Sequence, residues 1–236
     1  MSKVGTTNKA VRDEWVKKSL DAIPQGAKIL DAGAGERQYQ NLCSHLKYVS
    51  QDFGRYDGEG DGAGLHTKSW DTQGVDIVGD ICDIPAPDES FDAVMCTEVL
   101  EHLPEPTRAL EEFARLLKPG GTILLTAPFC SLTHFSPFHF HSGFNQHYYR
   151  FHLERLGFQI KEISANGGYF DYLAQELRRL PHVADQYCGR ARRPLLKLAA
   201  RLMLLFLGKL ARSDSGSNEL LCFGYHVLAV KSGKAE

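Results

Sequence analysis

Three short apolar runs, each closed by an acidic residue, constrain the fold of this chain most strongly. Residues 28–31 and 47–52 both end in an aspartate, and residues 75–78 are followed by Gly79 and Asp80. A helix-length gap separates the first two runs, which is the β-α-β rhythm of a parallel sheet. Because ligands bind at the carboxyl ends of strands in such a sheet, we expect the acids to meet at one edge.

The rest of the chain continues this pattern. Apolar residues recur at helical spacing in residues 8–22, and a second amphipathic helix is expected to stop at the Lys-Pro-Gly-Gly sequence of residues 118–121. A further helix is expected near residues 148–156. Further strands are expected at residues 91–96, 122–127 and 158–163 and within residues 219–231.

The composition is that of an ordinary soluble globular protein, with 43% hydrophobic and 24% charged residues. The 27 basic and 29 acidic side chains nearly balance, so the chain has no overall attraction to nucleic acid and we expect no such partner. Its six cysteines are scattered, without zinc-finger spacing, and are expected to be reduced. Residues 1–10 lack the apolar run of a secretory signal, so we expect a cytoplasmic protein.

A glycine pair directly after the first run marks the expected ligand site. Gly33 and Gly35 let the backbone approach a ligand closely, because a Cβ atom at either position would occupy the space that the ligand needs. Asp31, Asp52 and Asp80 close the three runs, where a bound ligand would lie across the sheet edge.

Several short motifs between residues 27 and 130 occur together in one known family. Residues 29–36, Ile-Leu-Asp-Ala-Gly-Ala-Gly-Glu, resemble the first motif of class I S-adenosylmethionine-dependent methyltransferases, and residues 79–81 with 90–94 resemble the third and fourth. Residues 98–103 and 117–121 complete a pattern typical of the small-molecule branch, whose domain is called type 11. This combination of motifs is specific.

The resemblance implies S-adenosylmethionine as the cofactor and a role for each matched position. Asp31 and the backbone of Gly33 and Gly35 would hold the methionine part of the cofactor. Asp52 would accept hydrogen bonds from the ribose hydroxyls. The other implied contacts are Asp80 and the Ile81 amide at the adenine edge, and Thr97 and Glu98 near the methionine moiety and the transferred methyl group.

The expected fold is α/β: a Rossmann-like, doubly wound, mostly parallel seven-stranded sheet with an antiparallel last strand. We expect a single domain over residues 1–236, with residues 165–218 inserted as a helical cap before the last strand.

In place of the usual helix between the second and third strands, residues 54–64 are glycine-rich, and we interpret them as a flexible lid. Asp57, Glu59 and Asp61 resemble the start of a calcium loop, but Lys68 stands where its bidentate glutamate belongs.

Two other functions remain open from the sequence. A nicotinamide dehydrogenase also has a glycine turn and an acid after the second strand, but Gln38 stands where its third glycine belongs. The acid before the glycine pair and the Lys-Pro-Gly-Gly turn favour the methyl donor. The third hypothesis is a non-catalytic, methyltransferase-like binding module, which would have an empty acceptor side.

The acceptor of the methyl group is expected to contact an aromatic and histidine-rich segment, residues 128–152. Positioning supplies much of the acceleration of methyl transfer, and a general base adds to it when the acceptor is a hydroxyl. His139, His141 and His147 are candidates for this base or for orienting the acceptor. No acid lies within the segment to complete a metal site with them, so we expect no metal.

The acceptor is expected to be a small molecule or a glycan, methylated on oxygen or nitrogen. Tyr149 and Arg150 are candidate substrate contacts, and Arg150 suits an anionic acceptor group. Residues 144–158 loosely resemble a segment of methyltransferases from bacterial surface-polysaccharide clusters, which implies a sugar or glycolipid hydroxyl. We expect His102 to have a capping and packing role.

A basic, leucine-rich segment precedes the last strand. Residues 178–212 contain nine basic residues and one acid, Asp185. We expect residues 190–212 to form a helix that packs on the domain or on a second subunit of a homodimer. The alternative is a helix that rests on anionic lipid at the inner face of a membrane, with its leucines in the headgroup boundary. The basic residues on its expected stripe are Arg190, Arg193, Lys197, Arg201, Lys209 and Arg212.

Overall fold

The computed structural model describes residues 3–188 and 193–233. Contacts within the chain divide it into two compact units. The helical unit comprises residues 1–13 and 165–223, and the sheet unit comprises residues 14–164 and 224–236. The single domain that we expect from the sequence stays a prediction.

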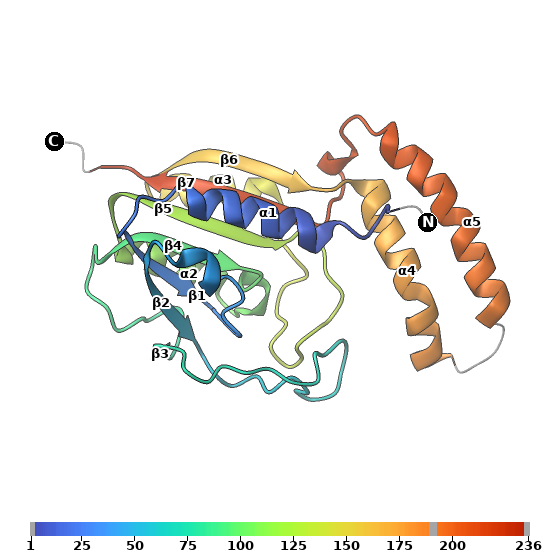
Figure 1. Cartoon of the computed structure of the whole chain (residues 1–236), viewed down its shortest axis with the longest axis horizontal. Helices are drawn as coiled ribbons and strands as arrows, with labels where there is room; N and C mark the ends of the chain where they lie inside the picture. Colours follow the sequence, from blue (N-terminus) through green and yellow to red (C-terminus); the bar gives the residue numbers. More distant parts are fainter. Residues whose placement is uncertain (1–2, 189–192, 234–236) are drawn as a thin grey trace. The chain divides into compact units, whose positions relative to one another are not determined.

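A seven-stranded sheet has the order β3-β2-β1-β4-β5-β7-β6 (Figure 1). β1 pairs in parallel with β2 and β4, β2 with β3, and β4 with β5, whereas β7 is antiparallel to β5. The expected Rossmann-like fold with an antiparallel last strand is therefore confirmed. The strands are β1 (Lys28–Ala32), β2 (Lys47–Asp52), β3 (Ile77–Val78), β4 (Phe91–Thr97), β5 (Leu117–Pro128), β6 (Phe158–Asn166) and β7 (Gly224–Lys231).

The core beside β1 forms where the helix α1 (Asn8–Asp21) packs on the central strands. Trp15, Val16 and Leu20 are buried on α1 and pack in one cluster with Ile29 of β1 and Met95 of β4. This burial fixes the strands that carry the expected site. The other helices along this part of the chain are the short 3₁₀ helices η1 (Gln40–Cys43) and η2 (Leu100–His102), and the α-helices α2 (Pro106–Leu116) and α3 (Gln146–Arg155).

One predicted boundary is wrong: β5 begins at Leu117, directly after α2, rather than at residue 122. Leu117 is buried and pairs with Phe91 of β4, and its carbonyl accepts a hydrogen bond from the Lys231 ammonium at 2.7 Å. Gly120 has a φ of 79°, so the Lys-Pro-Gly-Gly sequence forms an irregularity within the strand instead of a separate turn.

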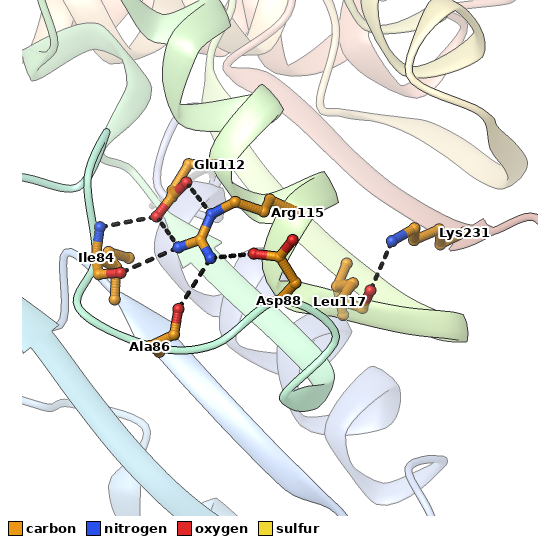
Figure 2. Close-up of polar contacts among 7 residues, drawn as sticks. All are labelled: Ile84, Ala86, Asp88, Glu112, Arg115, Leu117 and Lys231. Carbon is orange, nitrogen blue, oxygen red and sulfur yellow. Dashed lines mark hydrogen bonds and ion pairs between the residues drawn. The ribbon is translucent and has the colours of Figure 1, made fainter.

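Arg115, in the last turn of α2, holds the loop that leads from β3 to β4 (Figure 2). Its guanidinium donates to the carbonyls of Ile84 at 3.1 Å and Ala86 at 2.9 Å, and it pairs with Asp88 and Glu112, each at 2.6 Å. The Glu112 carboxylate in turn accepts the Ile84 N–H at 2.8 Å, and the Arg115 contact lowers the pKa of Glu112. The loop that begins with Asp80 and Ile81, two of the expected cofactor contacts, is thereby tied to α2.

In the helical unit, α4 (Tyr169–Tyr187) and α5 (Arg193–Arg212) lie side by side (Figure 1). Ala174 of α4 and Leu207 of α5 are buried in a cluster with Val4 from the start of the chain. Both helices fall within residues 165–218, and their role as a cap stays a prediction. Arg190 lies outside the described residues. Within the described ranges, no helix is both long and apolar enough to cross a membrane.

Candidate active site

The expected site lies where the strand order reverses. β1 is flanked by β2 on one side and by β4 on the other, and Asp31 pairs with Met95 in the parallel register. The carboxyl ends of these three strands therefore meet at one edge. In open α/β sheets this switch point is where ligands bind.

The loop after β1 has a shape that only glycine adopts without strain. Gly33 and Gly35 have φ values of 73° and 51°, in the left-handed region. A Cβ atom on Gly33 would lie 2.5 Å from the Val99 side chain, and one on Gly35 would lie 2.4 Å from the Trp70 ring. Both positions therefore require glycine because of the protein's own packing, in addition to the ligand approach expected from the sequence.

Asp31 is a buried carboxyl group at the end of β1, with 3% of its surface exposed. The Tyr48 hydroxyl donates a hydrogen bond to it at 2.6 Å. Burial raises the pKa of Asp31 to about 7, and the bond from Tyr48 only partly opposes this effect. A cation beside Asp31 would favour its charged form, so this group is suited to face a positively charged part of a ligand.

Asp52, at the end of β2, anchors the loops on either side of it. Its carboxylate accepts the Gly35 N–H at 2.9 Å and the Gly54 N–H at 2.8 Å. Asp52 is also nearly buried, with 5% of its surface exposed. Because a carboxylate offers about four lone-pair positions, two bonds leave acceptor capacity for ligand hydroxyls.

The turn after β3 lies beside the end of β2. The Gly79 N–H donates to the Asp52 carbonyl at 3.0 Å, and the Gln51 side chain donates to the Gly79 carbonyl at 2.8 Å. Gln51 also accepts the Gly33 N–H at 3.2 Å, so one side chain joins the glycine loop to this turn. Asp80 is exposed and Ile81 is buried there. Sequence analysis missed Gln51, and its position directly before Asp52 was the available signal.

Thr97 and Glu98 follow from the end of β4. Thr97 pairs with Thr126 of β5, and the Glu98 N–H donates to the Thr126 carbonyl at 2.8 Å. The Glu98 carboxylate accepts the Thr126 hydroxyl at 2.9 Å. Glu98 has a φ of 55°, so it turns the chain out of the strand. The structure thus brings the cofactor-binding candidates together at one edge.

The glycine-rich segment after β2 makes specific contacts that the lid interpretation omitted. Tyr56 stacks on Phe135 with ring centroids 4.4 Å apart. The Arg37 guanidinium donates to the carbonyls of Gln73 and Gly74 at 2.6 and 2.7 Å. The connection between β2 and β3, which contains Tyr56 and these two carbonyls, therefore contacts both the histidine-rich segment and the loop after β1. Asp57, in the sequence that resembles a calcium loop, accepts backbone N–H groups, which lower its pKa.

The three histidines proposed from the sequence occupy different surroundings. His139 lies within 4.7 Å of His134 between ring centroids, and its Nε2 is 3.1 Å from the Ser131 hydroxyl. The ring of His141 approaches the Pro104 carbonyl at 3.4 Å. His147 is exposed in the first turn of α3. Of the three, His139 belongs to a histidine cluster.

Sequence analysis placed no acid beside this cluster, but the structure brings Glu101 to it from η2. The carboxylate, 1% exposed, lies 3.7 Å from His102 Nε2 and 3.9 Å from His134 Nε2. The Glu101 carbonyl also accepts the N–H groups of Phe140 and His141, which ties the histidine-rich segment to η2. Burial lowers the pKa of His102 to about 3.

The two proposed substrate contacts lie on α3. Tyr149 is fully buried, and its hydroxyl has no hydrogen-bond partner among the described residues. Arg150 is exposed. Their contact with a substrate stays a prediction.

Comparisons with known proteins bear on this site. A family model described as a methyltransferase domain matches residues 30–125. The chain is 35% identical over 117 residues to the ubiquinone biosynthesis O-methyltransferase of Xanthomonas axonopodis pv. citri, which covers 49% of this chain and 48% of that protein. It is 31% identical over 119 residues to the tRNA (carboxymethyluridine(34)-5-O)-methyltransferase of Arabidopsis thaliana, covering 48% of this chain and 27% of that protein. The chain thus spans about half or less of the length of these relatives.

A solved structure agrees with the observed fold. An S-adenosylmethionine-dependent methyltransferase from Archaeoglobus fulgidus has a TM-score of 0.58 at 17% identity, over 98% of this chain and 97% of that one. The family match on residues 30–125 includes Asp31, both loop glycines, Asp52 and Asp80. Residues 30–125 therefore match the methyltransferase domain family, and the chain has the fold of an S-adenosylmethionine-dependent methyltransferase.

Proposed function

We propose that this chain transfers the methyl group of S-adenosylmethionine to a hydroxyl oxygen of a small molecule or glycan. The observation that carries the proposal is the convergence of Asp31, Asp52 and the glycine loop at the switch point of the sheet. The two curated relatives are both named as O-methyltransferases, which supports oxygen over nitrogen.

The residues present fit the cofactor. Asp31 would face its positive amino group, because ionisation of this buried carboxyl is favoured by a neighbouring cation. Asp52 would accept the ribose hydroxyls through its remaining lone pairs. Gly33 and Gly35 give the loop its left-handed turns beside Asp31 and Asp52. The Ile81 amide and Asp80 would contact the adenine edge. When bound, S-adenosylmethionine supplies an electrophilic methyl group on a sulfonium.

His139 is the proposed general base for the acceptor hydroxyl. Burial and then the neighbouring His134 lower the pKa of His139, so its ring is neutral and can accept a proton near neutral pH. The Ser131 hydroxyl beside Nε2 orients the ring. A base in this position contributes about 100-fold or more to the rate, while positioning supplies the larger share.

Transfer of a tritiated methyl group tests this function. The full chain is incubated with labelled S-adenosylmethionine and separate pools of glycans, lipid-linked sugars, phenols and amines. We expect label in a hydroxyl-bearing pool, a rate about 100-fold lower for His139→Ala, and an unchanged rate for His182→Ala, an exposed histidine on α4. Label in amines alone would contradict transfer to oxygen. Cofactor binding without any transfer would favour the non-catalytic module.

We further propose that α5 rests on an anionic lipid surface, which would suit a lipid-linked acceptor. One face of the helix packs in the helical unit through Ala200, Leu204 and Leu207. Lys197, Arg201, Lys209 and Arg212 could pair with anionic headgroups. Large apolar side chains of α5 that remain exposed are Leu195, Leu198, Leu202, Met203, Leu205, Phe206 and Leu210.

Sedimentation with lipid vesicles tests the membrane contact. We expect the chain to pellet with vesicles that contain phosphatidylglycerol and to remain in solution with neutral vesicles. Phe206→Asp should weaken this partition roughly tenfold, because it removes one exposed aromatic side chain that would be buried in the lipid. Leu220→Asp, at an equally exposed apolar position outside α5, is the matched control. Equal effects of both substitutions would contradict the proposal, and a dimer lost only in Phe206→Asp would assign α5 to a subunit interface.

The raised pKa of Asp31 predicts opposite effects on stability and on cofactor affinity. The folded state keeps the Asp31 proton up to about pH 7, whereas the unfolded chain loses it near its ordinary value of 3.8. Folding therefore takes up a proton in this window, and the contribution of Asp31 to stability falls as the pH rises through it. Binding of the cofactor's ammonium requires the charged form, so affinity should rise over the same window.

Asp31→Asn separates these two effects. At about pH 8 we expect a larger free energy of unfolding than in the wild type, with the difference shrinking toward about pH 5. Affinity for S-adenosylhomocysteine should fall about tenfold at the higher pH and lose its pH dependence. Urea unfolding and calorimetric titration measure the two quantities. A variant that is less stable at pH 8, or that retains the wild-type pH profile of binding, would contradict the role of Asp31.

A further inference from the structure

Three side chains outside the cofactor-binding edge form a group with the chemistry of metal ligands. Glu101 and His102 come from η2, and His134 comes from the histidine-rich segment. One potential ligand atom from each residue lies within 4.8 Å of the other two. Ligand bonds of about 2.0–2.2 Å place ligand atoms roughly 3–4 Å apart, so small side-chain rotations would complete the geometry.

Hydrogen bonds orient both imidazole rings in the same way. His102 Nδ1 lies 2.6 Å from the Phe138 carbonyl, and His134 Nδ1 lies 2.8 Å from the Leu132 carbonyl. Because a carbonyl oxygen only accepts, each Nδ1 must carry the proton, so the lone pair of each neutral ring lies on Nε2. Such bonds from the second ring nitrogen are the usual support of metal-binding histidines.

Both Nε2 atoms lie near the same carboxylate oxygen. Their distances from Glu101 Oε1 are 3.7 and 3.9 Å, longer than hydrogen bonds and close to the spacing of ligands around one ion. An ion placed among these three atoms could bind both imidazole nitrogens and the carboxylate oxygen.

We propose that Glu101, His102 and His134 bind a divalent transition-metal ion. Two imidazoles with one carboxylate form a ligand set found in catalytic zinc and non-haem iron sites, and they are softer than the all-oxygen sets that calcium and magnesium prefer. Three protein ligands leave positions on the ion open.

The surroundings indicate what the open positions would bind. His139 lies beside the group, with its ring centroid 4.7 Å from that of His134 and 6.0 Å from that of His102. An ion here would coordinate an oxygen of the acceptor next to the proposed general base. This role of the ion rests on the proposed methyl transfer, but binding of the ion does not.

Cobalt titration tests the site without cofactor or acceptor. The tag-free full chain is first stripped with chelator and dialysed, then titrated with Co²⁺, and visible absorption with calorimetry follows binding. We expect one ion per chain, with the absorption bands of Co²⁺ bound to nitrogen and oxygen ligands, and a higher melting temperature. Glu101→Gln and His134→Gln should each weaken binding about 100-fold or more.

His147→Ala, at an exposed histidine of the same region, should bind Co²⁺ like the wild type. Glu101 is buried, so its variant is checked for folding by circular dichroism, and the half-exposed His134 serves as the second test. A wild-type chain that binds no stoichiometric Co²⁺, or a folded His134→Gln variant that binds it normally, would overturn the proposal. Binding of S-adenosylhomocysteine by the same samples shows separately that the methyltransferase site is intact.

Discussion

The carboxylate of Asp52 holds together the loops that form the proposed cofactor site. It accepts the amides of Gly35 and Gly54, while the Asp52 carbonyl accepts the amide of Gly79. Three loops thus converge on one residue at the end of β2. The parallel register of β1 with β2 and β4 makes this possible, because it brings the carboxyl ends of the three strands to one edge.

The three acids at this edge differ in their burial and in their hydrogen-bond donors, so they are suited to different parts of a ligand. Asp31 receives a hydroxyl donor but sits deep in the protein, so its charge is disfavoured until a cation approaches. Asp52 receives two amide donors that compensate its charge, and Asp80 remains in contact with solvent. This gradient from buried to exposed matches a ligand with a cationic end, a diol and a polar base.

The local sequence predicted the strands of the site well, because each is a short apolar run whose end is marked by an acid or a glycine. It placed the start of β5 at residue 122, since Lys-Pro-Gly-Gly usually ends an element, whereas pairing of Leu117 with Phe91 extends the strand through it. Local sequence patterns could not predict contacts between segments that are distant in the sequence. The stacking of Tyr56 on Phe135 and the approach of Glu101 to His134 both depend on how the chain folds back on itself.

The dependence on contacts between distant segments also explains why the sequence analysis grouped the histidines differently from the structure. Spacing favoured His139, His141 and His147 as a set because they are close in sequence. In the structure, of these three, the ring of His139 lies beside the proposed metal ligands, and its partners come from η2 and from earlier in the segment. A ligand set sought only within residues 128–152 lacks an acid, but the tertiary fold supplies Glu101.

Calorimetric titration of the full chain with S-adenosylhomocysteine and, separately, with NAD tests the central claim most directly. We expect one molecule of S-adenosylhomocysteine per chain and no NAD binding. Asp52→Asn should weaken binding about tenfold to 100-fold, because it removes a charged acceptor for the ribose hydroxyls, while the exposed Asp21→Asn should leave it unchanged. Binding of NAD without S-adenosylhomocysteine, or equal affinities of the wild type and Asp52→Asn, would contradict the account.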